Sequence, residues 1–440
     1  WAPGSVNPST LTVEITTKDR GVSHGSGISD TKIKNLVIEQ QNEHSIHISN
    51  GKRIVLENLS VGKSETGINN YTSSGRPASE GNIIRNNHVH DTNLEGVYTQ
   101  GGAGHLIEGN VIERVSMSED RMSNAASNWG HFGIYTTDSA SNQTIRRNII
   151  KDVGYIGLIA TGSGLVTENY IENALVNMTD GGGIAFDFTD GMTISKNIVK
   201  DMYSDMTTMP TLYVGYIPLA KGIYFGDKDI KNTTIDANII MDIESDAVWM
   251  DHGTEYIGNK VTNNIIHGFT RSGIGVSDWS NGIDFPGQCA PNNSSVCFVA
   301  SYNDVVTGNK IYGLDSTQNP FYFLYSYSNG QGAKADFGTS NNNYFHNPYR
   351  TTKVQEVKNF VGTTSNYTLS QWQAASGEDA NSTASNYTLT NANDAADIYY
   401  NATSAPIIQS VSGCNANGTP LTGAQTIQPF NALVVEHGNC

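Results

Sequence analysis

Four aspartates in the middle of the chain have the chemistry and the spacing of a catalytic acid–base set. Asp180, Asp187, Asp227 and Asp251 each lie in or beside a short apolar segment, such as GIAFD, GIYFG or AVWMD. Paired carboxylates can act as acid and base, or as acid and nucleophile, on a glycosidic bond. Crowding like charges raises the pKa of at least one carboxyl group, as a general acid requires. Each aspartate also has a simpler interpretation, because Asp is a common turn residue.

Aromatic and basic side chains recur around the same segments. Aromatic rings combine a large apolar area with a polar edge and can stack on sugar rings; the candidates are Tyr98, Tyr135, Tyr224 and Trp249. Lys221 directly precedes one segment, and Arg271 stands two positions before another. His131 and His252 border the same region and could assist, or be hydrogen-bonded structure. These residues form the predicted substrate-binding set.

The elements that must position these side chains are short, repeated strands. A pattern of polar–Asn–apolar–x–apolar recurs at intervals of 21 to 29 residues where it is tight and 34 to 45 where something is inserted, at Asn35, Asn58, Asn87, Asn110, Asn148, Asn169, Asn197, Asn238, Asn264, Asn309 and, less regularly, Asn343. A second strand such as GIYTT or GIYFG precedes most copies. Such units bury their apolar faces only by stacking. The repeats predict a right-handed parallel β-helix with about ten or more coils and an internal asparagine ladder.

Alternation along the second strand predicts which side chains face outward. The outward set includes Tyr135, Tyr224 and Trp249 in one row and Asp187 and Asp251 in the next. Asp187 and Asp251 are two coils apart, which is about 9.6 Å between backbones at the usual strand spacing. Asp227 lies between them, slightly off the row. Inverting glycosidases separate their carboxylates by roughly 6.5–9.5 Å and retaining ones by about 5–5.5 Å, so both stereochemical outcomes stay open.

Insertions and the fading of the repeat predict the domain organisation. Two inserts, at about 116–130 and 202–220, precede the second strand of a coil, and a third carries Cys289 and Cys297. Inserts usually surround the binding face of a repeat protein, which predicts a walled groove over the second strands. We expect a β-helix over residues 1–350, a linker or capping segment over 351–396, and a small β-region over 397–440.

Composition excludes several classes of protein. The chain has 440 residues, 15% charged, and a formal net charge of −16 without a basic run. This argues against disorder and against nucleic acid as a partner. No apolar run approaches the roughly 20 residues that span a bilayer. The oligomeric state is left open.

The cysteines and the start of the chain predict a secreted or periplasmic protein. Local pairs Cys289–Cys297 and Cys414–Cys440 fit two disulfides better than a metal site. The chain begins at Trp1, from which we expect that a leader or a longer N-terminal part has been removed. Asp227 and Asp229, on either side of Lys228, could hold Ca²⁺; otherwise we expect no cofactor.

The coil pattern over about residues 25–350 resembles the pectin-lyase-like superfamily of right-handed β-helix proteins. The tail motif Trp372-x4-Gly377-x-Asp379-x2-Ser382, followed by YYNATSAP and TIQPFNALVV, resembles the C-terminal segment of secreted bacterial β-helix carbohydrate-active enzymes. Polygalacturonase-type members carry Asn-Thr-Asp, Asp-Asp and Gly-His-Gly motifs. None of these is present here as such, and Asp251-His252-Gly253 matches them only in part. The resemblance, closer to the glycoside hydrolases than to the lyases, implies the fold and the general chemistry, without a specific family or substrate.

Three functions compete on these observations. A glycoside hydrolase acting on an extracellular polysaccharide or oligosaccharide would use Asp187, Asp227, Asp251 and Asp180. A polysaccharide lyase would use a base and a cation, such as Lys221 and Arg271, on a uronic acid, but an acidic protein attracts a polyanion poorly. A non-catalytic, carbohydrate-binding or structural β-helix would need no row of carboxylates beside aromatic residues. The sequence favours the hydrolase.

Overall fold

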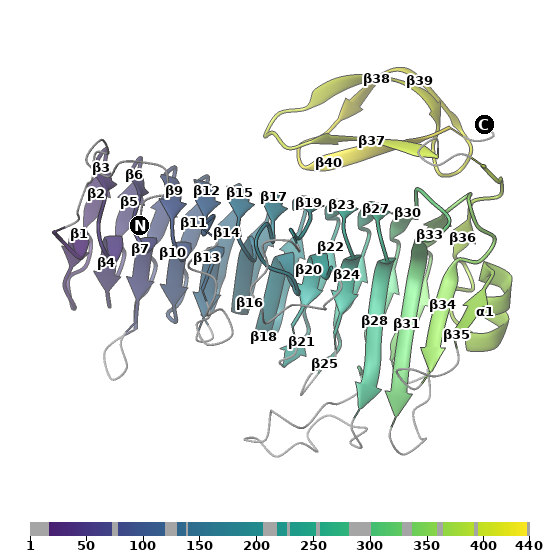
Figure 1. The fold of residues 1–440 in the computed structure, drawn as a ribbon, viewed down its shortest axis with the longest axis horizontal. Helices are drawn as coiled ribbons and strands as arrows, with labels where there is room; N and C mark the ends of the chain where they lie inside the picture. The colour runs from purple at the N-terminus through teal and green to yellow at the C-terminus, as the bar shows by residue number, and fades with distance from the viewer. Residues whose placement is uncertain are drawn as a thin grey trace, which may run out of the picture.

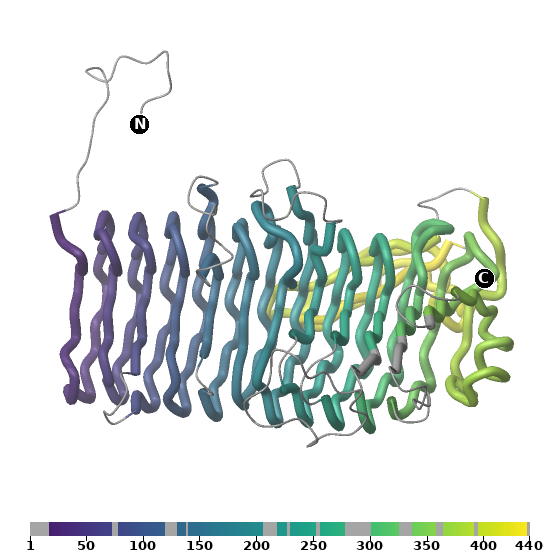
Figure 2. Tube along the Cα trace, turned by 60° about the horizontal axis from the view of Figure 1, so that its bottom comes forward, coloured from purple at the N-terminus to yellow at the C-terminus, as the bar shows by residue number. Residues whose placement is uncertain are grey.

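The computed structural model describes residues 17–72, 78–118, 130–137, 140–205, 218–226, 229–251, 256–280, 301–327, 337–358, 364–390 and 395–437. The chain winds into a long parallel β-helix, whose coils follow one another along the axis in chain order (Figure 1). The tube in Figure 2 shows the coils as an even stack of rungs. The predicted all-β solenoid is therefore confirmed.

Each regular coil contributes three strands, one more than the two that the repeat indicated at minimum. The strands that carry the candidate site residues pair in parallel with their counterparts in neighbouring coils. They are β1 (Arg20–His24), β4 (His44–Ser49), β7 (Thr66–Tyr71), β10 (Glu95–Gln100), β13 (Phe132–Thr137), β16 (Leu158–Thr167), β18 (Gly181–Ser195), β20 (Ala220–Phe225), β24 (Asp246–Met250), β28 (Ser272–Ser280), β31 (Asn319–Tyr327) and β34 (Val354–Lys358).

A second set of strands completes the 24-stranded sheet, because β16 and β18 run continuously from one face to the next. This set comprises β2 (Lys32–Lys34), β5 (Val55–Glu57), β8 (Ile83–Arg85), β11 (Leu106–Glu108), β14 (Gln143–Arg146), β21 (Ile230–Lys231), β22 (Thr234–Asp236), β25 (Tyr256–Ile257), β26 (Lys260–Thr262), β29 (Asp304–Thr307) and β32 (Gly338–Asn341), with β35 (Thr364–Tyr367) added antiparallel to β34.

The third strands form a separate 12-stranded sheet. Its members are β3 (Val37–Glu39), β6 (Ser60–Gly62), β9 (His88–Thr92), β12 (Val111–Val115), β15 (Ile149–Val153), β17 (Tyr170–Ala174), β19 (Ile198–Met202), β23 (Ile239–Ile243), β27 (Ile265–Phe269), β30 (Lys310–Tyr312), β33 (Tyr344–His346) and β36 (Thr383–Ala384).

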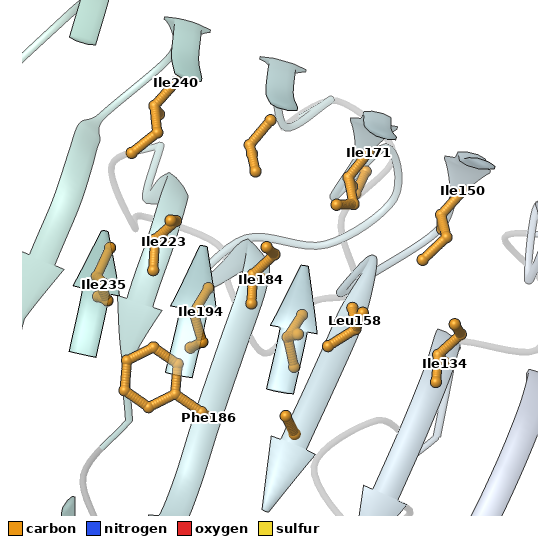
Figure 3. Packing of buried hydrophobic residues seen from close by; sticks show 14 of the residues in the cluster. Ile134, Ile150, Leu158, Ile171, Ile184, Phe186, Ile194, Ile223, Ile235 and Ile240 are labelled. Carbon is orange, nitrogen blue, oxygen red and sulfur yellow. The ribbon is translucent and has the colours of Figure 1, made fainter. Parts of the chain in front are cut away.

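Branched aliphatic side chains stack along the axis to form the core. Ile134, Leu158, Ile184, Ile223 and Val248 occupy the same register position on successive site strands, and all are fully buried. Figure 3 shows four of them facing isoleucines of the other two sets of strands. β-branched residues suit this pleated, buried surface, and the alternate positions must then point outward.

The predicted asparagine ladder is present, but it begins later than the repeat indicated. From Asn87 to Asn343 each side-chain amide donates to the Oδ1 of the next asparagine at 2.9–3.1 Å. Asn35 and Asn58 lie one position too early: both have positive φ, of 58° and 54°, at the turn before the ladder position. Leu59 fills that position and donates its backbone N–H to Asn87. The sequence alignment was therefore wrong by one residue in the first two coils.

A short cap ends the ladder within the predicted linker or capping segment. The helix α1 (Leu369–Ser376) begins at the capping box of Thr368 and ends at Gly377, whose φ is 80°. Asp379 is buried and accepts hydrogen bonds from the Trp372 indole at 2.9 Å, from Ser382 at 2.6 Å and from Asn343 at 3.2 Å. The residues of the tail motif thus close the end of the β-helix.

The C-terminal sheet packs on the outer face of the 12-stranded sheet (Figure 1). It is antiparallel and contains β37 (Ala396–Asn401), β38 (Ile407–Cys414), β39 (Pro420–Ile427) and β40 (Asn431–Glu436). Phe430 packs with Ile198, Ile239 and Met241 of the β-helix. No helix within the described residues has the length and apolar character to cross a membrane.

Candidate functional site

Two rows of outward side chains run along the site strands, and we call this surface the site face. The first row comprises His47, Asn69, Tyr98, Tyr135, Ile159, Ala185, Tyr224, Trp249, Gly275 and Tyr322. The second row lies two residues further along each strand and includes Gln100, Thr137, Thr161 and Asp187. Figure 1 shows these strands as one continuous parallel array, which fixes the order of both rows.

Asp187 and Asp251 lie in the second row, on either side of Gly226. Phe186, Phe225 and Met250 share a register position, so the residues that follow them are adjacent in the row. A Cβ at Gly226 would stand 1.9 Å from Oδ1 and 2.6 Å from Cγ of Asp187. The carboxylate of Asp187 therefore leans over the backbone of the middle coil, and only glycine leaves it room there. Both aspartates are half-buried.

Tyr224 binds Asp251 rather than presenting a free ring edge. Its hydroxyl donates a hydrogen bond of 2.9 Å to Oδ2 of Asp251. Burial, together with the charges of Asp251 and Asp180, raises the pKa of Tyr224 well above its usual value. The phenol therefore stays protonated and donates. Period-two reasoning placed this residue correctly in the first row but gave no sign of the bond.

Lys221 is buried beside this pair. Its Nζ lies 2.7 Å from Oδ1 of Asp180 and 4.1 Å from the centre of the Tyr224 ring. Only 3% of the Lys221 side chain is exposed, whereas Asp180 is 44% exposed. Asp180 has a positive φ of 61°, and its carbonyl accepts a hydrogen bond from Tyr155. Asp180 thus neutralises Lys221 at the edge of the site face.

Arg271, which is half-buried, forms a second ion pair in the coils after Tyr224. It donates from Nε to Oδ1 of Asp246 at 2.9 Å and from a guanidinium nitrogen to Oδ2, and Ser272 also donates to Asp246. Asp246 is fully buried. The Arg271 guanidinium stacks 4.4 Å from the Trp249 ring and 5.8 Å from that of Tyr322.

Trp249 differs from the exposed platform that the sequence predicted, because only 7% of it is exposed. Its ring lies over Gly275 of the next coil, where a Cβ would stand 2.4 Å from Cε3. Arg271 covers the ring, and Tyr322 is 6.0 Å from it. Side chains on adjacent rungs therefore bury a residue that faces away from the core.

The remaining described candidates lie nearer the N-terminus. Tyr98 and Tyr135 are half-buried and meet edge to face at 5.4 Å between centroids. His131 is 3% exposed, its Nδ1 is 3.0 Å from the Ser116 hydroxyl, and burial lowers its pKa. This burial favours the structural interpretation of His131 that the sequence left open.

Several predicted residues lie outside the described part of the chain. They are Asp227, His252, Cys289, Cys297 and Cys440, and the inserts expected to wall a groove fall mostly there as well. Cys414 is described and buried, while its predicted partner is not, so both disulfides and the groove stay predictions. The suggested Ca²⁺ ligand Asp227 is also outside. Among the described residues no group of three or more His, Cys, Asp or Glu could hold a metal ion.

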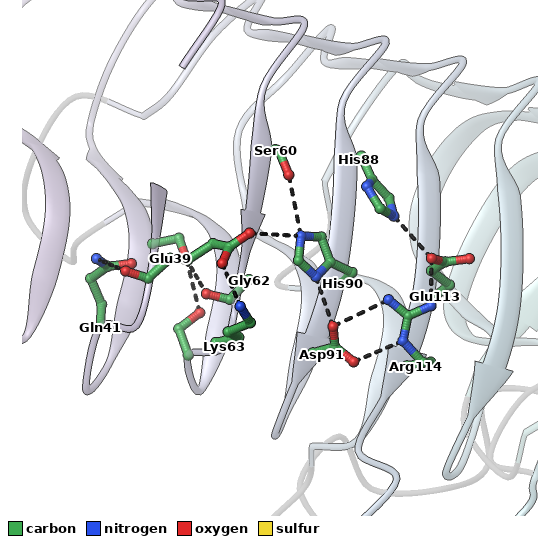
Figure 4. Close-up of polar contacts among 12 residues, drawn as sticks. Glu39, Gln41, Ser60, Gly62, Lys63, His88, His90, Asp91, Glu113 and Arg114 are labelled. Atoms are coloured by element: carbon green, nitrogen blue, oxygen red, sulfur yellow. Dashed lines mark hydrogen bonds and ion pairs between the residues drawn. The ribbon is translucent and has the colours of Figure 1, made fainter. Parts of the chain in front are cut away.

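A second polar cluster lies on the 12-stranded sheet and its edge (Figure 4). His90 contacts Glu39 at 3.3 Å and Asp91 at 2.8 Å, and Arg114 binds Asp91 through two nitrogens. Hydrogen bonds from Arg114, more than those from His90, lower the pKa of Asp91 to about 2. A hollow of about 580 Å³ beside Arg114 is lined by Asp91, Thr92, Asn93, Arg114, Met117, Ser118 and Asp152. None of the predicted site residues lines it, and the paired charges favour a structural role in joining coils.

Asp246, Tyr322 and Gly226 are the residues of the site face that sequence reasoning missed. Asp246 begins its strand and was outside the alternating positions considered, although a charged residue beside AVWM was visible as a signal. Tyr322 comes from a coil beyond a long insert, where the repeat spacing is least regular. Gly226 looked like an empty position in the row, whereas it accommodates the carboxylate of its neighbour.

Two family models match parts of the chain. One describes a right handed beta helix region and matches residues 117–319, which confirms the predicted handedness of the fold. The other describes the periplasmic copper-binding protein NosD and matches residues 7–205. Copper favours clustered His, Cys or Met ligands, and no cluster of His, Cys, Asp or Glu within the described residues fits it. No curated protein matches the sequence.

Several solved structures are similar to the chain at a low level. The A-module of a mannuronan C-5 epimerase from Azotobacter vinelandii is 15% identical, with 83% of this chain and 91% of that one covered and a TM-score of 0.37. A surface adhesin of Streptococcus pneumoniae is 13% identical, with 79% and 78% covered and a TM-score of 0.41. An alginate lyase from Paenibacillus is 12% identical, with 69% and 87% covered and a TM-score of 0.29. Likeness at this level assigns no activity to the chain.

Proposed function

We propose that the protein is a carbohydrate-active enzyme that hydrolyses glycosidic bonds in an extracellular or periplasmic polysaccharide, with Asp187 and Asp251 as its paired carboxylates. The observation that carries the proposal is the position of these aspartates in one row on either side of Gly226, where Asp187 occupies the space of an absent side chain. A structural turn residue has no need of a glycine under its carboxylate in the next coil.

The spacing of the pair supports an inverting mechanism. Two rungs separate the backbones by about 9.6 Å. Asp187 leans over the coil between them, and we propose a carboxylate separation within the roughly 6.5–9.5 Å that leaves room for a water molecule. One carboxyl group then protonates the leaving oxygen while the other activates the water. Asp227, which follows Gly226 in sequence, stays in the proposal as a third carboxylate, and Tyr98 and Tyr135 as contacts for sugar rings further along the site face.

Substitution of each aspartate tests the proposal. The protein is incubated with neutral, sulfated and uronic-acid polysaccharides, and new reducing ends and ultraviolet absorbance of unsaturated products are recorded together. We expect reducing ends without absorbance, and their loss in Asp187→Asn and in Asp251→Asn. Asp190→Asn is the matched control, because Asp190 is exposed on the same strand and, among the described residues, its carboxylate accepts a hydrogen bond from Asn232. Full activity in both site variants would refute the assignment.

A lyase acting on uronic acids is the second candidate, and the two cations beside aromatic rings favour it. Lys221 lies over Tyr224 and Arg271 over Trp249, and β-elimination needs a base and a cation to neutralise the substrate carboxylate. Asp180 and Asp246 already pair with these cations, which leaves less positive charge for a polyanion. A rise in absorbance together with reducing ends would establish the lyase and move the test to Lys221→Met and Arg271→Met.

A further inference from the structure

The contact between Tyr224 and Asp251 distinguishes the two carboxylates of the proposed pair. An ionised carboxylate only accepts hydrogen bonds, and a phenol O–H at 2.9 Å supplies one to Oδ2 of Asp251. A hydrogen bond to the charged form of an acid favours that form. The bond therefore stabilises Asp251 as the anion.

The ring of Tyr224 is fixed, so the hydroxyl cannot easily leave Asp251. The Lys221 ammonium lies 4.1 Å from the ring centre and is itself held by Asp180. The base of the side chain packs closely against the preceding coil, where a Cβ at Gly182 would stand 2.9 Å from the Cβ of Tyr224. The Lys221 contact and the bond to Asp251 thus hold the ring and the hydroxyl of Tyr224.

We infer that Tyr224 is a positioning residue that holds Asp251 as the ionised base of the pair and so leaves Asp187 as the acid. The inference rests on the proposed function, and it adds the role of each carboxylate. The described charged and titratable groups around Tyr224 and Asp251 are Asp180, Asp187, Lys221, Tyr256 and Arg271. Of these, Asp187 follows in the same row, and an ionised neighbour favours its protonated form.

The proton balance of hydrolysis follows from these roles. Asp251 takes a proton from water as the water oxygen bonds to the anomeric carbon. The bond between that carbon and the leaving oxygen breaks, and Asp187 gives its proton to the leaving oxygen. Water is added across the bond, and the next turnover requires only that the proton return from Asp251 to Asp187 through solvent. Tyr224 keeps its own proton throughout.

The pH profile of Tyr224→Phe tests the role of the hydroxyl. The ring stays, so we expect KM for the polysaccharide to change little. The acidic limb of kcat/KM, which reports ionisation of the base, should move upward by about one pH unit, the size expected for a lost hydrogen bond to a charged group. Tyr155→Phe is the control, since it removes a phenol bond of 2.8 Å to a backbone carbonyl in the same region. An unmoved acidic limb in Tyr224→Phe would overturn the inference.

Substrates with an activated leaving group test which aspartate is the acid. An aryl glycoside of the sugar that proves active needs no protonation on leaving, so Asp187→Asn should keep much more activity on it than on the polysaccharide. Asp251→Asn should lose both activities. The reverse pattern, or equal losses, would overturn the assignment of roles.

A direct titration separates failure of this inference from failure of the proposed function. The carboxyl pKa of Asp251 is measured by carbon NMR in the wild type and in Tyr224→Phe, without any substrate. A higher pKa in the variant supports the role of Tyr224 even if Asp187→Asn and Asp251→Asn were fully active, a result that would remove only the proposed hydrolysis. An unchanged pKa overturns the inference even if both aspartates prove essential.

Discussion

The phenol of Tyr344 on β33 lies 3.1 Å from Oε2 of Glu436 on β40, and this buried contact joins the β-helix to the C-terminal sheet. His346 Nε2 is 3.7 Å from the same oxygen and 2.6 Å from the Tyr387 hydroxyl. Burial raises the pKa of Glu436 to about 7 and lowers that of His346 to about 3. Glu436 is therefore the group in this contact that changes charge near neutral pH, because His346 stays neutral there.

Docking of the C-terminal sheet should therefore weaken as pH rises through about 7. Glu436 has a higher pKa when folded than the ordinary 4.5. Its stabilising contribution is therefore complete below about pH 4.5 and lost above about 7. The change amounts to up to about 3 kcal/mol. Amide hydrogen exchange of β37–β40 at several pH values measures it. Glu436→Gln should abolish the dependence, and an equal dependence in that variant would contradict the prediction.

Gly226→Ala should reduce activity far more than stability. The added Cβ would meet Oδ1 of Asp187 at 1.9 Å, and the carboxylate, as the mobile end of a side chain, must move. Displacement of about 1 Å at a reacting group can cost about 100-fold in rate. The measurement is kcat on the active polysaccharide beside the urea midpoint. Gly25→Ala serves as control, because its Cβ meets nothing closer than 3.9 Å; equal rates in the two variants would argue against the role of Asp187.

Asn197→Ala should destabilise the fold through the groups it leaves behind. Asn197 donates to Val166 O and Asn238 and accepts from both nitrogens of Asn169, all buried. Each buried group left unpaired costs about 1–3 kcal/mol, so several kcal/mol are expected in the free energy of unfolding by urea. Asn366→Ala, at an exposed position with one surface bond, should change it by less than about 0.5 kcal/mol. Similar losses of unfolding free energy in both variants would contradict the prediction, because they would show that water molecules satisfy the hydrogen bonds that Asn197 makes.

Asp246→Ala should cost about 1–3 kcal/mol of unfolding free energy, because it removes a fully buried carboxylate and leaves Arg271, whose side chain is 32% exposed, without its partner. Glu80→Gln breaks the exposed contact with Lys52 and should cost at most about 1 kcal/mol. Calorimetric or urea unfolding of the two variants compares them directly. Restored stability in the double variant Asp246→Ala, Arg271→Met would support this explanation, and a further loss would contradict it.

The fold and the rows of the site face could be predicted from sequence because both follow from periodicity. Repeats of 21 to 29 residues and alternation within GIYFG and AVWMD place Asp187 and Asp251 outward in the same row, two coils apart. Distances between side chains on neighbouring rungs, in contrast, depend on which neighbour lacks a side chain. Trp249 is buried because Gly275 admits its ring, and Asp187 leans toward Gly226 for the same reason.

Other features escaped the pattern because single residues break it. Asn35 matches the repeat in sequence, yet its φ of 58° places it at the turn. The ladder position of this coil is therefore the next residue. The bond between Tyr224 and Asp251 joins two coils separated by 27 positions, and no local spacing encodes the direction of a hydroxyl. Asp246 precedes the alternating part of its strand, where the chain has just turned a corner.

The asparagine ladder also gives the solenoid a direction. From Asn87 onward the side-chain amide of each ladder asparagine donates a hydrogen bond to the next coil. The series ends at Asn343, which donates to Asp379 in the cap. The described coils before Asn87 are not joined by the ladder, because leucine occupies the ladder position of the second coil. We therefore expect local unfolding to be easier in the coils before Asn87 than in the coils that the ladder joins. Amide hydrogen exchange should accordingly be faster in those first coils and slow down along the axis.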